Sequence, residues 1–194
     1  MVLAGGASTR FGSDKLAAIY RGMPLLHHPV LRLIEVCNEV VVVLSAEGPE
    51  PSLPLGVPAR FARDAAEGSG DRQGPLAGLL AGLNETTTDL ALVVGGDMPE
   101  PSTPVLLEML AVAGEAGTDA VALQDGDLFR PLPMLVRADR GRHVAHALLH
   151  DGERRLRGFL DALRVGVIDE ATWTSLDPQR RSLHDIDVPG DLQI

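Results

Sequence analysis

The chain has 194 residues, of which 45% are hydrophobic, and its formal net charge at pH 7 is −10. This length accommodates one α/β domain with a full core, so we expect a single domain over residues 1–194. The acidic balance and an aromatic content of 3% exclude nucleic acid and anionic membranes as partners, and no run approaches the roughly 18 apolar residues of a membrane span.

A short apolar run at residues 2–4 precedes a glycine-rich loop, which predicts a strand that leads into an anion-binding turn. Gly5 and Gly6 have no Cβ, so their backbone can take positive φ and bring N–H groups close to a phosphate. Hydroxyl and basic side chains follow in the loop, namely Ser8, Thr9, Arg10 and Lys15. They supply hydrogen-bond donors and positive charge, and we predict that the triphosphate of a nucleotide lies here.

The spacing of this loop differs from that of two familiar nucleotide-binding motifs. A P-loop places its lysine directly after the last glycine, whereas two residues separate Gly12 from Lys15. The Rossmann spacing G-x-G-x-x-G fails because Gly5 and Gly6 are adjacent. The loop therefore belongs to another class of nucleotide-binding turn.

Residues 3–15 resemble the signature L-A-G-G-x-S-x-R-x-G-x-D-K of the MobA-like nucleotidyltransferases, the molybdenum cofactor guanylyltransferase group. The resemblance implies an α/β fold of three layers, with a Rossmann-like, mostly parallel sheet and helices on both faces, similar to the nucleotide-diphospho-sugar transferases. It also implies that the loop binds the nucleotide through Leu3, Ala4, Gly5, Gly6, Ser8 and Lys15.

Lys15 is the only lysine in the chain, since every other residue counted as Lys or Arg is arginine. A compact, rotatable ammonium suits a position among phosphate oxygens. The alternative, a stray lysine in an arginine-rich chain, would leave this residue at any position. We therefore predict that Lys15 and Arg10 are catalytic and neutralise charge on the phosphates.

Residues 24–62 predict one helix and two strands. Pro24 suits the first position of a helix, and apolar residues with helical spacing follow at 25–34. The β-branched run at 40–44 is apolar on both faces, as in a central parallel strand, and a shorter strand is expected at about 59–62.

Two histidines and the single cysteine lie near this helix. We interpret His27 and His28 as surface or capping imidazoles rather than metal ligands, because no cysteine or carboxylate lies at ligand spacing. Cys37 falls within the apolar pattern and cannot form an internal disulfide, so we interpret it as a core thiol. A reducing, cytoplasmic location fits this composition.

Residues 74–82, G-P-L-A-G-L-L-A-G, predict a helix that approaches a sheet closely and presents its first N–H groups to a ligand. Helix–sheet packing alone explains the small residues equally well. The resemblance favours the ligand, since G-P-L-A-G is the second signature of the family and implies nucleotide contacts by Gly74, Pro75, Leu76 and Gly78. Asp64 matches the aspartate that precedes this signature in the family, which implies that it reads the base.

The strand predicted at residues 90–94 ends at Gly95-Gly96-Asp97. Asp97 then lies at the carboxyl end of a parallel strand, where open α/β sheets bind ligands. An alternative role is to begin the turn toward the helix expected at 103–115. In the family, D-M-P carries the metal-binding aspartate, so the resemblance makes Asp97 a metal ligand and a catalytic residue.

The next part of the chain predicts the rest of the sheet. We expect strands at 118–123, 128–136 and 165–168, a tight turn at 124–127, and helices at 143–149 and 154–163. Pro131-Leu132 resembles the strand that precedes the acceptor site in the family, which implies that Arg130 faces the acceptor's phosphate. The stretch around Trp173 predicts no element.

The C-terminal segment contains two aspartates in alternation with apolar residues. In a strand, Asp185 and Asp187 would share one face, with Ile186 and Val188 on the other. The family commonly has N-x-N-T-P-x-D-L here, with its second position near the metal, and D-I-D resembles the form of related cytidylyl- and guanylyltransferases. The resemblance thus assigns Asp187, with Asp97, to Mg²⁺, which commonly takes one or two carboxylates plus phosphate oxygens.

Together these residues predict a nucleotidyltransferase that moves a nucleoside monophosphate from an NTP to a phosphorylated acceptor and releases pyrophosphate. The resemblance implies GTP, molybdopterin and Mg²⁺. CTP is the alternative nucleotide, because Ser45 and Ala46 follow the second strand where guanylyltransferases of the group often have an asparagine. The other candidates are a different phosphorylated acceptor and a non-catalytic nucleotide-binding module, for which two metal carboxylates are unnecessary. The sequence indicates no oligomeric state.

Overall fold

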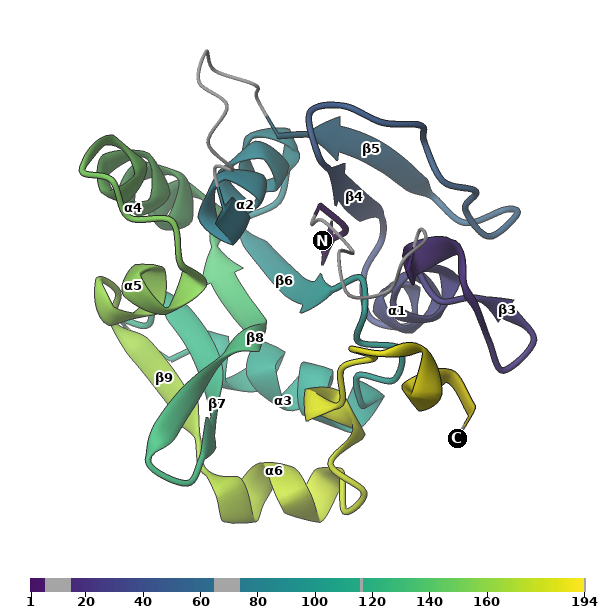
Figure 1. Cartoon of the computed structure of the whole chain (residues 1–194). Coiled ribbons are helices and arrows are strands. Elements are labelled where there is room, and N and C mark those ends of the chain that lie inside the picture. The colour runs from purple at the N-terminus through teal and green to yellow at the C-terminus, as the bar shows by residue number, and fades with distance from the viewer. Residues whose placement is uncertain (6–14, 65–73, 116, 194) are drawn as a thin grey trace.

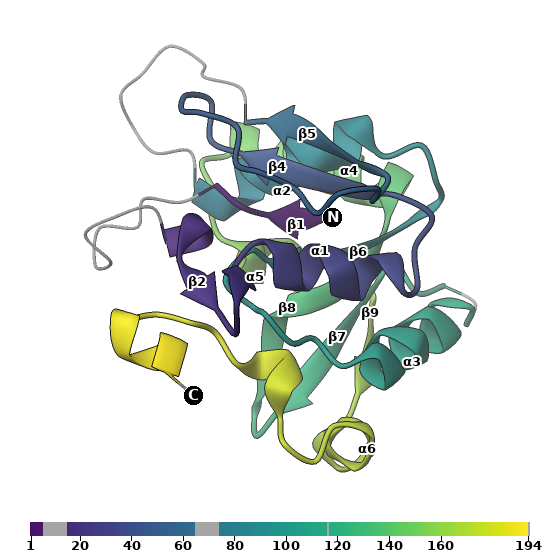
Figure 2. The same cartoon turned by 90° about the vertical axis from the view of Figure 1, so that its right-hand side faces the viewer.

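A computed structural model describes residues 1–5, 15–64, 74–115 and 117–193 of the chain. Its centre is a seven-stranded sheet with the strand order β5-β4-β1-β6-β8-β7-β9 (Figures 1 and 2). The strands are β1 (Val2–Leu3), β4 (Val40–Leu44), β5 (Ala59–Arg63), β6 (Leu90–Gly95), β7 (Ala120–Asp125), β8 (Leu128–Arg137) and β9 (Val165–Ile168). Strand β8 is antiparallel to β6 and β7, and the other neighbouring pairs are parallel. The predicted mostly parallel α/β sheet is confirmed.

Helices cover both faces of the sheet and complete the three predicted layers (Figure 1). One face packs against α2 (Gly74–Glu85), α4 (Ala138–His150) and α5 (Leu156–Asp161). The other packs against α1 (His27–Ile34), α3 (Thr103–Ala113) and α6 (Glu170–Leu176). In the described ranges, none of these helices has both the length and the apolar character needed to cross a membrane.

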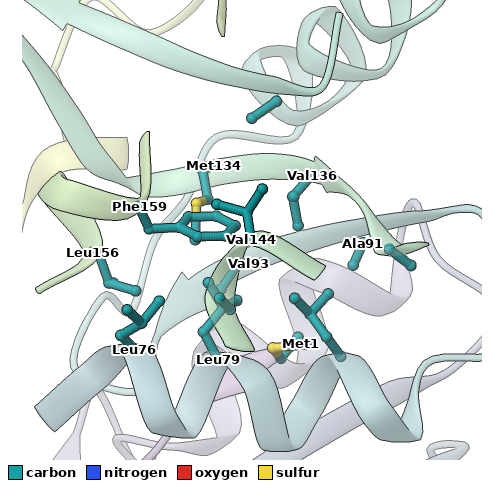
Figure 3. Close-up of a cluster of buried hydrophobic side chains, with 14 of the residues drawn as sticks. Met1, Leu76, Leu79, Ala91, Val93, Met134, Val136, Val144, Leu156 and Phe159 are labelled. Atoms are coloured by element: carbon teal, nitrogen blue, oxygen red, sulfur yellow. The ribbon is translucent and has the colours of Figure 1, made fainter. Parts of the chain in front are cut away.

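The two apolar clusters follow from the alternation of side chains along each strand. In β4, Val41 and Val43 pack into the cluster on the α2 side, whereas Val40 and Val42 pack into the cluster on the α3 side. A strand that is buried on both faces must be apolar throughout, which explains the run at this position. Figure 3 shows the α2-side cluster, where Leu76 and Leu79 point from α2 toward the sheet.

Helix α2 lies close to the sheet because it presents glycine at the contact. A Cβ at Gly82 would come within 2.6 Å of the Met1 side chain and within 2.7 Å of Cγ2 of Val43. The predicted close approach of this helix is therefore confirmed at Gly82. A larger residue there would push α2 away from β1 and β4.

The prediction that a helix begins at Pro24 is wrong. Met23–Pro24 forms β3, which pairs with β2 (Ile19–Tyr20) in a small separate sheet, and α1 begins at His27. The N–H groups of Leu25 and Leu26 donate to carbonyls of the segment at 16–18, so these residues remain tied to that segment. Pro29 falls in the first turn of α1, where no intrahelical donor is required.

Helix α6 was not predicted, and α4 begins earlier than predicted. The Asp169 side chain caps α6 by accepting a hydrogen bond of 2.7 Å from the Thr172 N–H. The side chain of Trp173, on this helix, is fully buried. Helix α4 starts at Ala138, directly after β8, rather than at 143. Its first turn is polar, so apolar spacing did not reveal it. The strands predicted at 40–44 and 165–168 are confirmed as β4 and β9.

Candidate active site

Four parallel strands end at the same edge of the sheet, and the residues that follow them converge there. Ala4 and Gly5 follow β1, Ser45 follows β4, Asp64 follows β5 and Asp97 follows β6. Two further segments meet this edge: the 3₁₀ helix η1 (Lys15–Ala17) and the C-terminal segment, which contains η2 (Arg181–Leu183) and η3 (Pro189–Gln193). Figures 1 and 2 both show the C-terminal segment lying beside the β2–β3 hairpin.

The side chain of Lys15 lies between two carboxylates. Its Nζ donates a hydrogen bond of 2.9 Å to Oδ2 of Asp97 and lies 3.5 Å from Oδ1 of Asp187. The Lys15 side chain is 12% exposed, whereas those of Asp97 and Asp187 are 38% and 65% exposed. The structure thus brings together three predicted site residues that are far apart in the sequence.

Two glycines position Asp97. The N–H of Gly96 donates to the Leu3 carbonyl at 2.9 Å, so the turn after β6 stays paired with the end of β1. A Cβ at Gly96 would lie only 3.3 Å from Cα of Ala4, and one at Gly95 would lie 2.6 Å from Oδ1 of Asp97. Glycine at both positions therefore allows the Asp97 side chain to fold back over the end of the strand.

The C-terminal segment is attached to the same turn. The N–H of Ile186 donates to the Asp97 carbonyl at 2.9 Å, and the Ile186 side chain is fully buried in a small apolar cluster with Tyr20 of β2. The Asp191 carboxylate accepts a hydrogen bond of 2.8 Å from the N–H of Asp187. These contacts hold Asp187 beside Lys15.

The predicted strand-like alternation of the C-terminal segment is wrong for its apolar residues. Ile186 is fully buried, whereas Val188 is exposed. The N–H of Val188 donates to the Asp191 carboxylate at 3.0 Å, and η3 begins at Pro189. The backbone therefore turns at this point, and among the described strands none pairs with this segment to hold Val188 on the face of Ile186.

Asp185 is a further carboxylate of the site, which the predicted set of ligands omitted. Desolvation raises the pKa of Asp185 to about 6, with added contributions from the negative charges of Asp97 and Asp187. The positive charges of Arg130 and Lys15 oppose this rise in pKa. The D-x-D spacing was the available signal, because both aspartates flank the anchored Ile186.

The carboxylates of Asp97 and Asp187 offer the hard oxygen ligands that Mg²⁺ prefers. Within the described ranges, no three side chains among His, Cys, Asp and Glu are arranged to hold a metal ion. The other positions around Mg²⁺ would therefore be filled by phosphate oxygens and water. Because the Lys15 ammonium already lies between both carboxylates, the donor set suits a cation.

The predicted nucleotide-binding residues at the ends of β1 and β5 lie along the same edge. The Ala4 N–H donates to the Val43 carbonyl at 2.8 Å, and Gly5 packs so closely on Ser45 that a Cβ would lie 3.2 Å from its amide nitrogen. Burial raises the pKa of the Asp64 carboxyl. In the described part of the chain, this carboxylate has no hydrogen bond or ion pair.

The start of α2 is held by the loop before α5. Gly74 has a φ of +75°, and a Cβ there would lie 2.8 Å from the Arg154 carbonyl oxygen, which accepts a hydrogen bond from the Leu76 N–H at 3.1 Å. The Leu76 side chain is fully buried, and Gly78 faces Val43 of β4. Within this signature, the N–H of Leu76 is therefore already hydrogen-bonded within the protein. Pro75 is exposed but has no N–H to donate to a ligand.

Arg130 lies on β8, and its Nε is 3.4 Å from Oδ2 of Asp125 across the β7–β8 hairpin. Its charge reaches Asp185, as the lowering effect on that pKa indicates. The predicted roles of Gly6, Ser8 and Arg10 concern residues that lie outside the described ranges.

Residues 1–166 match the family model of the MobA-like NTP transferase domain. The chain belongs to this family. The matched range contains Lys15 and Asp97 and ends before Asp187. The recognition of a MobA-like nucleotidyltransferase from the first loop is confirmed.

Two relatives show how far this similarity extends along the MobA-like chain. A probable molybdenum cofactor guanylyltransferase of Chloroflexus aggregans is 35% identical over 204 aligned residues, which cover 100% of this chain and 91% of the relative. A second, from Natronomonas pharaonis, is 31% identical and is matched over 100% of this chain and 94% of its own length.

Solved structures with the same fold include other nucleotidyltransferases. Molybdopterin-guanine dinucleotide biosynthesis protein A of Archaeoglobus fulgidus superposes with a TM-score of 0.75 at 22% identity, with coverage of 99% of this chain and 93% of that one. The 2-C-methyl-D-erythritol 4-phosphate cytidylyltransferase of Thermus thermophilus gives a TM-score of 0.68 at 19% identity, with coverage of 98% and 93%. The MobA-like fold is thus shared by enzymes named for different nucleotides.

Proposed function

We propose that this chain is a molybdenum cofactor guanylyltransferase, which transfers GMP from GTP to the phosphate of molybdopterin and releases pyrophosphate. The observation that carries the proposal is the position of the Lys15 ammonium between Asp97 and Asp187, at the edge of the sheet where the glycine-rich loop begins. The names of the relatives from Chloroflexus aggregans and Natronomonas pharaonis support the choice of reaction.

Asp97 and Asp187 would hold Mg²⁺ in this reaction. When bound, the ion neutralises negative charge on the phosphates and fixes their orientation. Lys15 lies close enough to both carboxylates to donate to phosphate oxygens beside them. We place Arg10, from the same loop, with Lys15 as a second positive charge on the triphosphate.

The acceptor needs no general base, because a phosphate monoester is already largely anionic near neutral pH. One of its oxygens attacks the α-phosphorus of the nucleotide in line. The new P–O bond forms as the bond to the leaving pyrophosphate breaks, and the electron pair of that bond leaves on the pyrophosphate oxygen. The protein then contributes mainly by positioning the groups and by neutralising charge.

Asp64 supports guanine as the base. Its carboxylate is an acceptor of hydrogen bonds, it is partly desolvated, and it has no partner among the described side chains. Guanine presents two neighbouring N–H donors, from its ring nitrogen and its amino group, which one carboxylate can accept together. We expect Asp64→Asn to lower the preference for GTP over the other nucleotides, and an unchanged preference would remove Asp64 from base recognition.

CTP is the second candidate nucleotide. Ser45 follows β4, where guanylyltransferases of the group often have an asparagine, and the fold is shared with a cytidylyltransferase of Thermus thermophilus. A non-catalytic nucleotide-binding role is the candidate from another class.

One experiment separates these candidates. The purified protein is incubated with Mg²⁺, molybdopterin and each of the four NTPs in turn, and pyrophosphate release is measured. We expect release with GTP. Release with CTP alone would favour the cytidylyl reaction. No release with any nucleotide would contradict transfer to molybdopterin and would favour the non-catalytic role. The same assay without Mg²⁺ tests the metal requirement.

A further inference from the structure

A pocket of about 470 Å³ opens beside the carboxylates, which is within the usual size range of small-molecule sites. Its walls come from the end of β2, the residue Glu100, the β7–β8 hairpin and the segment around η2. Four of the residues that line it are arginines, Arg21, Arg130, Arg180 and Arg181, against two carboxylates, Glu100 and Asp125. In a protein with a net charge of −10, this local excess of positive charge indicates an anionic ligand.

Two of these arginines are fixed by the protein. Arg180 pairs with Asp125 and, at 2.7 Å, with Glu170, and its guanidinium lies 4.6 Å from the ring centroid of Trp173. Arg21 pairs with Glu100, and its guanidinium lies 5.1 Å from the ring centroid of Tyr20. Close ion pairs and aromatic contacts hold these two guanidinium groups in place, so both form part of the pocket walls.

The other two arginines are held loosely. Nε of Arg130 lies 3.4 Å from Oδ2 of Asp125, and Nε of Arg181 lies 3.8 Å from Oε2 of Glu100. Charge-assisted hydrogen bonds are normally about 2.7–2.9 Å long, so these separations leave both guanidinium groups free to turn toward a closer anion. Each neighbouring carboxylate is already paired with a fixed arginine, because Asp125 pairs with Arg180 and Glu100 pairs with Arg21.

By strand order, the pocket wall formed by the β7–β8 hairpin lies beyond the proposed metal ligand Asp97 from the predicted nucleotide site. Along the sheet, Asp64 follows β5, the glycine-rich loop follows β1, Asp97 follows β6, and the pocket adjoins the β7–β8 hairpin beyond it. His184 lines the pocket, and the next residue in the chain, Asp185, belongs to the carboxylate cluster, so the pocket wall leads along the chain to that cluster. A nucleophile that attacks the α-phosphorus from this side would approach opposite the nucleotide.

We propose that Arg181 joins Arg130, which the family resemblance already assigns to the acceptor's phosphate, in binding that phosphate, with the organic part of the acceptor in the pocket. This inference rests on the proposed function, because it assigns the second substrate of that reaction. Two guanidinium forks supply several N–H donors in a geometry that matches phosphate oxygens. They hold the non-attacking oxygens and leave one oxygen directed at the nucleotide.

The first test is a kinetic comparison of Arg130→Gln and Arg181→Gln with the unsubstituted enzyme. We expect each change to raise KM for molybdopterin about tenfold, the size of one lost charge-assisted hydrogen bond. KM for GTP should stay unchanged. Arg181→Lys keeps the charge without the fork and should recover part of the loss. An unchanged KM for molybdopterin, or an equal rise in KM for GTP, would overturn the assignment.

Arg140→Gln is the matched control. Arg140 lies on α4, its side chain is 47% exposed, and its Nε lies 4.0 Å from Oδ2 of Asp119. Arg181 is similar, with a side chain that is 44% exposed and an Nε 3.8 Å from Oε2 of Glu100. We expect this change to leave both KM values as they are. A rise in KM for molybdopterin in this variant would mean that loss of any exposed arginine has the same effect.

A binding measurement separates failure of this inference from failure of the proposed function. Inorganic phosphate is titrated into the nucleotide-free protein and into the Arg130→Gln/Arg181→Gln double variant, and binding is followed by NMR. We expect saturable binding that the double variant loses, with melting temperatures that agree. Equal binding by both proteins would contradict the inference even if guanylyl transfer occurs, whereas loss of binding would support it even if transfer fails.

Discussion

The backbone N–H of Ile186 donates a hydrogen bond of 2.9 Å to the carbonyl oxygen of Asp97. This bond joins the C-terminal segment to the turn after β6, so it links the backbones that carry the two proposed Mg²⁺ ligands. Asp187 follows the donor directly, and Asp97 supplies the acceptor. The buried Ile186 therefore helps to set the separation of the two carboxylates.

Replacement of Ile186 by alanine tests this connection. The side chain is fully buried, so Ile186→Ala should lower the free energy of unfolding by about 2–4 kcal/mol. It should also raise the Mg²⁺ concentration needed for half-maximal activity, because loss of the buried side chain loosens the segment that carries Asp187. Calorimetry and a Mg²⁺ titration measure the two effects. Ile186→Val is the control and should cost only about 1 kcal/mol, with an unchanged titration.

Lys15→Ala should abolish turnover and leave the fold intact. The Lys15 side chain is 12% exposed and lies at the edge of the sheet, outside the main apolar clusters. The proposed role of its ammonium is to neutralise phosphate charge. We expect kcat to fall by roughly 10²–10³, the usual size of one lost electrostatic contact to developing charge. Circular dichroism should be unchanged. Activity close to that of the unsubstituted enzyme would remove Lys15 from the mechanism.

Asp97→Asn should raise the Mg²⁺ requirement, because a neutral amide binds a divalent cation more weakly than a carboxylate does. The measurement is activity against Mg²⁺ concentration at saturating GTP. Asp161→Asn, at an exposed position at the end of α5, is the control with the same change of charge. Superimposable titrations for Asp97→Asn and the unsubstituted enzyme would contradict the role of Asp97 as a ligand.

The buried Asp119 gives a prediction for stability against pH. Its Oδ2 and Oδ1 accept hydrogen bonds of 3.0 and 2.9 Å from Arg164, and these bonds lower the pKa of Asp119. A carboxyl with a lowered folded-state pKa contributes stability above its unfolded pKa of about 4, and this contribution is lost as the pH falls through the folded value. Because the Arg164 side chain is 73% exposed, solvent screens the pair, and we expect its contribution to stability to be small.

The corresponding experiment compares the melting temperatures of the unsubstituted protein and Asp119→Asn from pH 7 to pH 3. The difference should be largest near pH 7 and should shrink below about pH 4 as Asp119 takes up a proton. A difference that stays constant over this range would show that the pair contributes through packing rather than charge.

The sequence predicted the sheet well because its signals are local. The β-branched run of β4 and the glycine turn after β6 are each decided within a few residues, and both appear where expected. The start of α1 was misplaced because Leu25 and Leu26 are bonded to the chain at 16–18, which no local pattern reveals. Long-range pairing also places β8 antiparallel between β6 and β7.

The candidate site was predictable to the extent that a motif marks its residues. Lys15, Asp97 and Asp187 each stand in such a motif, and the structure brings them together. The pocket wall is different, because Arg181 acquires its surroundings only when η2 folds against Glu100. Nothing in the residues next to Arg181 indicates that Arg130 lies across the same pocket.

The position of Lys15 would also couple the binding of a nucleotide to the binding of a divalent ion. While its ammonium lies against Asp97, it offsets the repulsion between the Asp97 and Asp187 carboxylates. In the proposed reaction, a nucleotide that draws the ammonium onto its phosphates would leave these carboxylates uncompensated and so increase their affinity for a divalent ion. The ion would in turn release Lys15 for the nucleotide, and by thermodynamic linkage each would strengthen the binding of the other by the same factor.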